Sequence, residues 1–177
     1  MQNLSDKIVQ IGFDKFAEIT LSQVVFDVSF RKLCEDNVCR QYGTNYMCPP
    51  LIGGADECIA KVKKYNGGMV VQSIVKLEDS FDFEGMMAGQ KEHDNRLRIL
   101  AEFLRNDGGQ YLVLGAGPCP QCAECCAIKK KLCINPDKAI SSVEAHCIDV
   151  TKTVTNAGLK YNNGEATVSY VGLVLTK

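Results

Sequence analysis

The hydrophobic and polar positions of the chain follow two periodicities, one typical of helices and one typical of strands. Apolar residues from Leu4 to Ile19 recur at near-helical intervals, and the stretch from Val24 to Phe30 is rich in β-forming residues with partial alternation. The beginning of the chain is therefore predicted to form a helix followed by a strand.

The same criteria predict the elements further along. Asp56 is a candidate N-cap for a helix through about Lys64, which Asn66-Gly67-Gly68 would end. The other predicted elements are a buried strand at 69–77, a helix at 84–106, a short strand at 111–114, a helix at 150–157 closed by Gly158, and a strand at 167–175. This order favours an α/β fold, with one layered domain spanning residues 1–177, a sheet of roughly four strands and two cysteine-rich loops. The order of the strands is not readable.

Two stretches, 31–54 and 119–147, follow neither periodicity and hold nine of the ten cysteines. A loop as long as the first would be unusual in a compact domain unless it wraps around something. Each stretch follows a predicted strand, and α/β folds usually build their sites where loops leave the ends of strands. We therefore expect the two stretches to meet in one region.

Charge and composition exclude several classes of function. The chain has 20 Lys and Arg against 21 Asp and Glu, so no field of one sign attracts nucleic acid or an anionic membrane. It has no apolar run of about 18 residues and no signal-peptide pattern, which predicts a cytoplasmic protein. In that reducing compartment, clustered cysteines bind metals or act in catalysis rather than form disulfides. The oligomeric state is not indicated.

The strongest chemical signal is the run Cys119-x2-Cys122-x2-Cys125, followed by Cys133. Closely spaced thiolates suit an iron–sulfur cluster or tetrahedral zinc. The repeated x2 spacing favours a cluster of the 4Fe-4S type, because bacterial ferredoxins open with the same run, whereas zinc sites more often use two separated pairs. Cys133 lies seven residues beyond Cys125 rather than three, so it could close the same cluster or reach a second one.

The first stretch holds a second, more widely spaced group, Cys34-x4-Cys39-x8-Cys48, with Pro49-Pro50 directly after it. These three thiols could be metal ligands held by a rigid loop or buried structural thiols. Cys58 lies in a predicted helix and is expected to be a core residue. Cys126 is expected to be a bystander, because neighbouring residues rarely point at one metal.

Three further features have two interpretations each, and one has a single interpretation. His146 and Cys147 could complete a metal site or fill a structural role. His93 lies among charged residues and is expected on a solvated helix face. The run Lys129-Lys130-Lys131 is either a solvated charge run or a group that offsets an anionic cluster and docks an acidic redox partner protein.

Four ordered motifs carry a family resemblance: C-x4-C-R-x-Y-G-x4-C-P-P from Cys34, L-G-A-G-P-C-x2-C-x2-C from Leu114, C-x2-P-x-K-A from Cys133 and S-x-E-A-x2-I-D-V from Ser142. Together they resemble a family of uncharacterised, cysteine-rich predicted metal-binding proteins, a domain of unknown function common in anaerobic archaea and bacteria. The resemblance implies that the metal ligands are Cys34, Cys39, Cys48, Cys119, Cys122, Cys125 and Cys133. It implies no reaction, and Cys58 and Cys126 look like additions to the family pattern.

Two 4Fe-4S clusters bound only by thiolates need eight cysteines, one more than the seven predicted ligands. Either an eighth residue is the last ligand, or one iron has no protein ligand. A fully ligated cluster carries electrons, whereas an open iron can bind a substrate. We therefore expect an iron–sulfur cluster carrier or electron-transfer accessory protein. The alternatives are a redox enzyme with an open iron site and a structural zinc-binding interaction module. No catalytic base is evident, so catalytic residues are not assigned and enzyme activity stays an open question.

Overall fold

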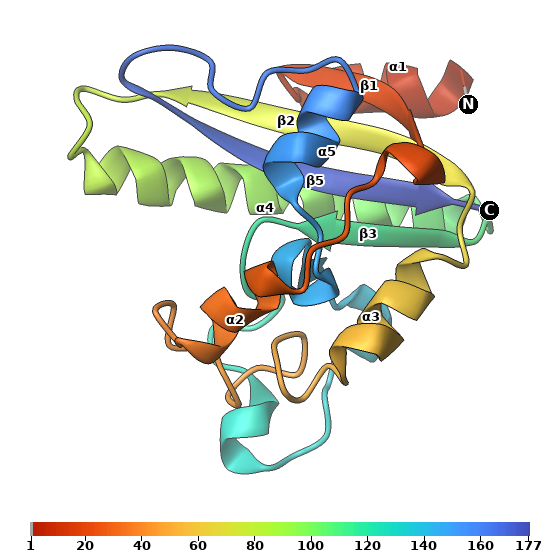
Figure 1. The fold of residues 1–177 in the computed structure, drawn as a ribbon, viewed down its shortest axis with the longest axis vertical. Coiled ribbons are helices and arrows are strands. Elements are labelled where there is room, and N and C mark those ends of the chain that lie inside the picture. Colours follow the sequence, from red (N-terminus) through yellow and green to blue (C-terminus); the bar gives the residue numbers. More distant parts are fainter. Residues whose placement is uncertain (1) are drawn as a thin grey trace.

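A five-stranded sheet forms the centre of the computed structural model, which describes residues 2–177 (Figure 1). The strands are β1 (Lys15–Thr20), β2 (Gly67–Lys76), β3 (Tyr111–Gly115), β4 (Ser141–Ser142) and β5 (Thr167–Thr176). Their order is β1-β2-β5-β3-β4, and every pair is antiparallel except the parallel pair of β3 and β4. The two longest strands, β2 and β5, pair along their whole length at the middle of the sheet.

Five α-helices surround this sheet: α1 (Gln2–Ile11), α2 (Ser29–Glu35), α3 (Ala55–Val62), α4 (Phe83–Asn106) and α5 (Val150–Asn156). Within residues 2–177, none of the helices combines the length and the apolar character needed to cross a membrane. Short 3₁₀ turns interrupt the long connections, and three of them, η2 (Cys126–Lys129), η3 (Pro136–Lys138) and η4 (Glu144–His146), lie in the second cysteine-rich stretch.

Both faces of the sheet are covered, because alternate residues of the central strands are apolar on both sides. Met69 and Val71 of β2 pack with α1 and α4 in one hydrophobic cluster. Val70, the residue between them, belongs to a second cluster that includes Val62 of α3 and Val154 of α5. The fold is thus the expected α/β layered arrangement, with five strands where the sequence predicts roughly four.

Most of the predicted elements are confirmed within one or two residues: the strands β2, β3 and β5 and the helices α4 and α5. Gly158 follows α5 with a φ of 80°, the left-handed conformation expected after a helix. The helix α3 is also confirmed, but it begins at Ala55, and the Glu57 carboxylate accepts a hydrogen bond of 2.7 Å from the Gly54 N–H. Asp56 is therefore inside the first turn and is not the N-cap.

The prediction of one helix from Leu4 to Ile19 is wrong. The helix α1 ends at Ile11, where Gly12 adopts a φ of 95° and donates its N–H to the Val9 carbonyl. The following residues form β1, an edge strand paired with β2. The apolar spacing continues through the turn because Ile8 of α1, Phe13 of the turn and Phe16 of β1 all pack in the same hydrophobic cluster.

The prediction of a strand from Val24 to Phe30 is also wrong. Phe26 forms one isolated bridge with Ile148, and α2 already begins at Ser29. The Asp27 carboxylate accepts a hydrogen bond of 2.9 Å from the Ser29 N–H and so turns the chain into that helix. The stretch is rich in β-forming residues, but only one residue of a neighbouring segment is in place to pair with it.

Candidate metal centre

The two cysteine-rich segments meet at one end of the molecule, as the sequence predicts. We call residues 31–54 the first segment and residues 116–140 the second segment. The Tyr46 hydroxyl of the first segment donates a hydrogen bond of 2.9 Å to the Lys131 carbonyl of the second. Both segments lie below the sheet in Figure 1, where the turquoise turn belongs to the second segment. The second segment follows β3 as expected, whereas the first continues from α2 rather than from a strand.

Five thiols of the second segment face a common small cavity. Its volume is about 20 Å³, and residues 45–47 of the first segment also line it. The cysteines that line this cavity are Cys119, Cys122, Cys125, Cys126 and Cys133. The four cysteines predicted as ligands in this segment are therefore gathered by the fold, together with Cys126, the expected bystander.

Nitrogen donors point at two of these sulfurs. Burial raises the pKa of the Cys119 thiol, while hydrogen bonds from the backbone N–H groups of Gln121 and Ile140 act in the opposite direction. The Asn135 side-chain amide donates to the Cys122 sulfur at 3.6 Å. Such N–H···S contacts stabilise the negative charge of a thiolate and tune the potential of iron–sulfur clusters. The donor set of this cavity therefore fits a metal that prefers thiolates.

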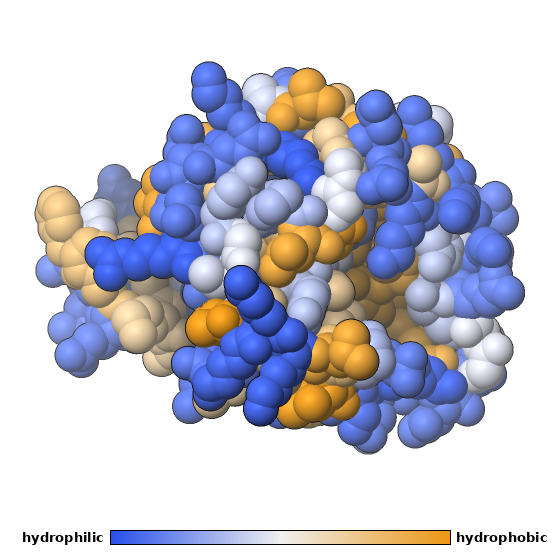
Figure 2. All heavy atoms as spheres, turned by 90° about the horizontal axis from the view of Figure 1, so that it is seen from below, coloured by the Kyte–Doolittle hydropathy of each residue, from blue (hydrophilic) through white to orange (hydrophobic). Residues whose placement is uncertain are grey.

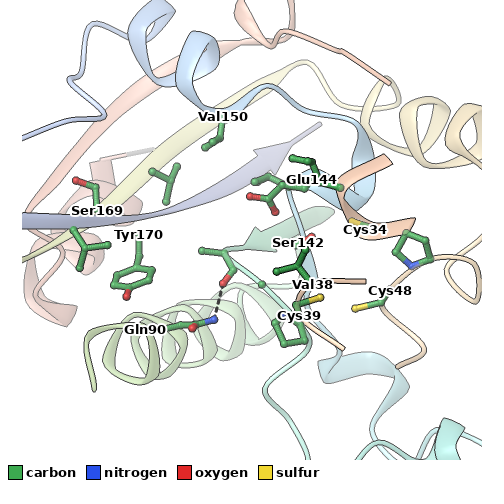
Figure 3. A pocket seen from close by; sticks show the side chains of 18 of the residues that line it. Cys34, Val38, Cys39, Cys48, Gln90, Ser142, Glu144, Val150, Ser169 and Tyr170 are labelled. Carbon is green, nitrogen blue, oxygen red and sulfur yellow. Dashed lines mark hydrogen bonds between the residues drawn. The ribbon is translucent and has the colours of Figure 1, made fainter. Parts of the chain in front are cut away.

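The thiols of the first segment line a different and larger cavity of about 450 Å³ (Figure 3). Cys34, Cys39 and Cys48 all border it. Burial, followed by the neighbouring thiols Cys39, Cys34, Cys119 and Cys125, raises the pKa of Cys48 to about 12. Cys48 therefore lies near cysteines of both segments.

The pKa of Cys34 is also raised, first by burial and then by the Glu144 carboxyl. Within residues 2–177, the structure brings no three His, Cys, Asp or Glu side chains into a group that could hold a metal ion directly. The fold thus gathers the predicted ligands around two adjoining cavities, and their sulfurs have to turn toward a common point to bind metal. Metal-binding loops commonly take their final geometry together with the metal.

The two remaining thiols contact a buried arginine. The Arg31 guanidinium donates to the Cys58 sulfur at 3.5 Å and to the Ala145 carbonyl at 2.9 Å. Its side chain also bonds to the Cys147 thiol, and both cysteines are buried. The expected core position of Cys58 is confirmed. Cys147 lies in the same group beside Arg31 and does not border the cavities lined by the predicted ligands.

The two histidines are both buried. His146 lies in η4, and its Nδ1 is 3.1 Å from the Ser142 carbonyl oxygen. The prediction of a solvated His93 is wrong, because its ring lies on the side of α4 that faces the sheet, 2.9 Å from the Ser73 hydroxyl. Of its charged neighbours, Glu92 and Arg98 are exposed, whereas Arg96 reaches the same Ser73 hydroxyl, so charge in the nearby sequence does not indicate the exposure of His93. Burial lowers the pKa of each histidine to about 4.

The sequence does not indicate the residues that complete the larger cavity. Glu144 stands on its wall beside Cys34, and Gln90 and Tyr170 border the opposite side (Figure 3). Glu144 belongs to the S-x-E-A motif, which is the one signal for it in the sequence, but the motif alone gives it no role. Gln90 and Tyr170 come from α4 and β5, and only the packing of these elements brings them to the cavity.

An α/β sheet that brings two thiol-rich segments together around adjoining cavities defines a cysteine-rich metal-binding protein. The chain belongs to the family of predicted metal-binding proteins called DUF2284, whose model matches residues 17–176. The resemblance seen in the four motifs is thereby confirmed. Comparisons with the curated proteins and with the solved structures found no match.

Proposed function

We propose that this protein is an iron–sulfur protein that carries electrons or delivers clusters. The second segment would hold a cluster through Cys119, Cys122, Cys125 and Cys133. The observation that supports this most is the convergence of these four thiols on one cavity, with N–H donors directed at the sulfurs of Cys119 and Cys122. When bound, such a cluster supplies one-electron redox chemistry at low potential.

The first segment would hold a second centre through Cys34, Cys39 and Cys48. These three thiols border the larger cavity, whereas the cysteines of the second segment border the smaller one. Three protein ligands leave one position of a four-coordinate site for another group, and the larger cavity is the space beside it. This arrangement supports the alternative that the protein is a redox enzyme with an open iron site.

The surface of the second segment supports an acidic redox partner. Lys130 and Lys131 are exposed between Cys125 and Cys133, and Lys129 already pairs with Glu124 at 2.6 Å. Three large apolar side chains of the same segment are also exposed: Ile128, Leu132 and Ile134. Figure 2 views the molecule from the end where this segment lies, and hydrophobic patches are interspersed there among hydrophilic side chains. Such a mixture fits transient docking of a negatively charged protein.

One observation favours the second candidate, a structural zinc protein. The cavity of the second segment, at about 20 Å³, has room for a single ion, and its thiols would need to move apart for a cube of iron and sulfide. Four cysteines around one ion are a common structural zinc site.

The two candidates differ in the composition of the purified protein. We expect anaerobically purified protein to contain iron and acid-labile sulfide in equal amounts and to show the broad visible absorption of thiolate-bound clusters. A colourless protein with about one zinc ion per chain would contradict the proposal and support the structural zinc site.

A further inference from the structure

The cavity beside Cys34, Cys39 and Cys48 has the size and lining of a small-molecule site. Its volume of about 450 Å³ falls within the range of ligand pockets, which is roughly 300–1,000 Å³. Most of its wall is apolar, and four valines, which we call the valine wall, come from β5, α5 and the turn before η4: Val143, Val150, Val168 and Val171. Thiols occupy one end of the cavity (Figure 3).

The cavity contains one carboxyl group and no basic group. Glu144 points into it, and the lining includes no Lys, Arg or His (Figure 3). None of the ion pairs found within residues 2–177 involves Glu144. The surrounding protein raises the pKa of this carboxyl through desolvation, while a hydrogen bond with Ser142 acts in the opposite direction. A carboxyl group in these surroundings favours a ligand that brings hydrogen-bond donors and positive charge.

Aromatic rings add to this preference. Tyr42, Tyr161 and Tyr170 all border the cavity. The Tyr170 hydroxyl donates to the Met86 carbonyl on α4, so this side chain is held in place. After burial, the Glu144 carboxyl is the next cause that raises the pKa of Tyr161, which places this tyrosine near the same carboxyl. Tyrosine rings attract cations through their π-electrons, and the attraction grows where water is excluded.

The other polar groups that line the cavity carry no positive charge, and one of them already donates a hydrogen bond within the protein. The Gln90 amide donates to the Ala116 carbonyl at 3.1 Å, which leaves its own oxygen as an acceptor (Figure 3). The cysteine thiols are neutral when protonated and negative when ionised, so without a metal they offer no positive charge to an anion. An anionic ligand would therefore meet carboxyl, thiol and aromatic groups, with no cationic side chain to pair with.

We propose that this cavity binds a small organic cation, an amine with an apolar body, whose ammonium group contacts Glu144 while its body lies against the valine wall. Such a ligand would be placed beside Cys34. Glu144 and the valines recognise the amine without any metal, so this inference goes beyond the proposed iron–sulfur function and does not depend on it.

The test uses three molecules of similar shape and different charge. Purified full-length protein is titrated calorimetrically with 2-phenylethylamine, with the neutral 2-phenylethanol and with the anionic 3-phenylpropanoate. We expect the amine to bind at least about tenfold more tightly than either of the others. One hydrogen bond to a charged group contributes about this factor to the affinity. Equal affinity for the three molecules, or tighter binding of the anion, would overturn the proposal.

Two variants locate the site. Glu144→Gln is expected to weaken amine binding about tenfold or more, whereas the control Glu102→Gln, an equal charge change on the exposed face of α4, leaves it unchanged. Val168→Phe fills the apolar side and is expected to abolish binding of both the amine and the alcohol. Unchanged affinity in either folded variant, checked by circular dichroism, would refute the site. The metal content of each sample is measured separately, so loss of the cluster is distinguished from loss of amine binding.

Discussion

At the scale of single residues, the cysteines fall into three kinds of surroundings. Three border the larger cavity, five border the smaller one, and two contact Arg31 in the core. The first two groups line cavities, whereas the third lies beside a guanidinium group. The division agrees with the motif-based assignment except at Cys126, which shares the smaller cavity with four predicted ligands.

This division predicts which cysteines matter for metal binding. Cys122→Ser is expected to remove most of the metal held by the second segment, because its sulfur lies in the cavity and accepts a hydrogen bond from Asn135. Cys126→Ala and Cys58→Ala are expected to retain it. The amount of metal bound per chain in each variant, measured after anaerobic purification, tests this assignment of ligands. Loss of metal in either alanine variant would show that the assignment of ligands is wrong.

The buried histidines predict that stability depends on pH. Each has a folded-state pKa of about 4, below the ordinary value of about 6.5 that it takes when unfolded. The unfolded chain therefore binds protons first, and stability is lost as the pH falls from about 6.5 to about 4, by about 3 kcal/mol per histidine. Asp94 opposes this loss, since burial raises its folded-state pKa to about 6.

His93→Gln isolates one of these contributions. In the variant, the free energy of unfolding is expected to fall less steeply between pH 6.5 and 4, by up to about 1.4 kcal/mol per pH unit. Urea unfolding of both proteins across this range measures the slopes. Asp94 and His146 are present in both proteins, so the comparison removes most of their contribution. Parallel slopes would show that His93 titrates normally in the folded protein.

At the scale of elements, Arg31 links α2 to the segments around it. Its guanidinium donates to the Gly53 and Ala145 carbonyls, so it joins the first segment to η4 next to the larger cavity. Arg31→Met would leave the buried Ala145 carbonyl and the partly buried Gly53 carbonyl without this donor, and we expect it to reduce the free energy of unfolding by about 2–4 kcal/mol.

The matched control for this substitution is its neighbour. Lys32 is exposed on the same helix, and Lys32→Met is expected to change stability by less than about 0.5 kcal/mol. Chemical denaturation of the three proteins gives the comparison. If Arg31→Met were as stable as Lys32→Met, the guanidinium would not hold the first segment in place.

The elements also show what local sequence can and cannot predict. The long helix α4 and the central strands are predictable because their apolar periodicity runs over many residues without a break. The wrong predictions concern stretches whose secondary structure depends on tertiary contacts. Val24 to Phe30 has the composition of a strand but finds one bridging partner, and β4 is a strand of two residues recognisable only by its pairing with β3. In such stretches, tertiary packing has more influence on the backbone conformation than the local strand propensity has.

The candidate site is predictable to a similar degree. The spacing of Cys119, Cys122 and Cys125 by itself indicates a thiolate site, because short x2 turns place sulfurs on one face. The separation of the cysteines into two cavities is not predictable, since it depends on how residues 45–47 of the first segment come to line the cavity of the second segment. The exposure expected for His93 is wrong for the same reason, because helix orientation is set by the sheet and not by neighbouring charges.

At the scale of the whole molecule, charge is nearly balanced, but the second segment is locally basic. If a cluster lies behind Lys130 and Lys131, an anionic oxidant should reach it faster than a cationic one. We expect ferricyanide to oxidise the reduced protein at a rate that falls with ionic strength and falls further in the double variant Lys130→Glu/Lys131→Glu.

The control for this prediction changes the same charge elsewhere. Lys64 and Lys177 are exposed outside the second segment, and Lys64→Glu/Lys177→Glu is expected to keep the ferricyanide rate close to that of the unchanged protein. The rates are measured by stopped-flow absorption of the reduced protein. Equal slowing by the two double variants would show that overall charge, and not a local docking surface, controls the reaction.

The central claim is that two thiol-rich segments hold metal in two adjoining centres. It is tested most directly by iron and sulfide per chain in three anaerobically purified proteins: the unchanged chain, Cys34→Ser/Cys39→Ser/Cys48→Ser and Cys119→Ser/Cys122→Ser/Cys125→Ser. Each triple variant is expected to lose one centre and keep the other, so each retains roughly half of the iron and sulfide, since the two groups border different cavities. The same metal content in all three proteins, or complete loss in both variants, would contradict the account.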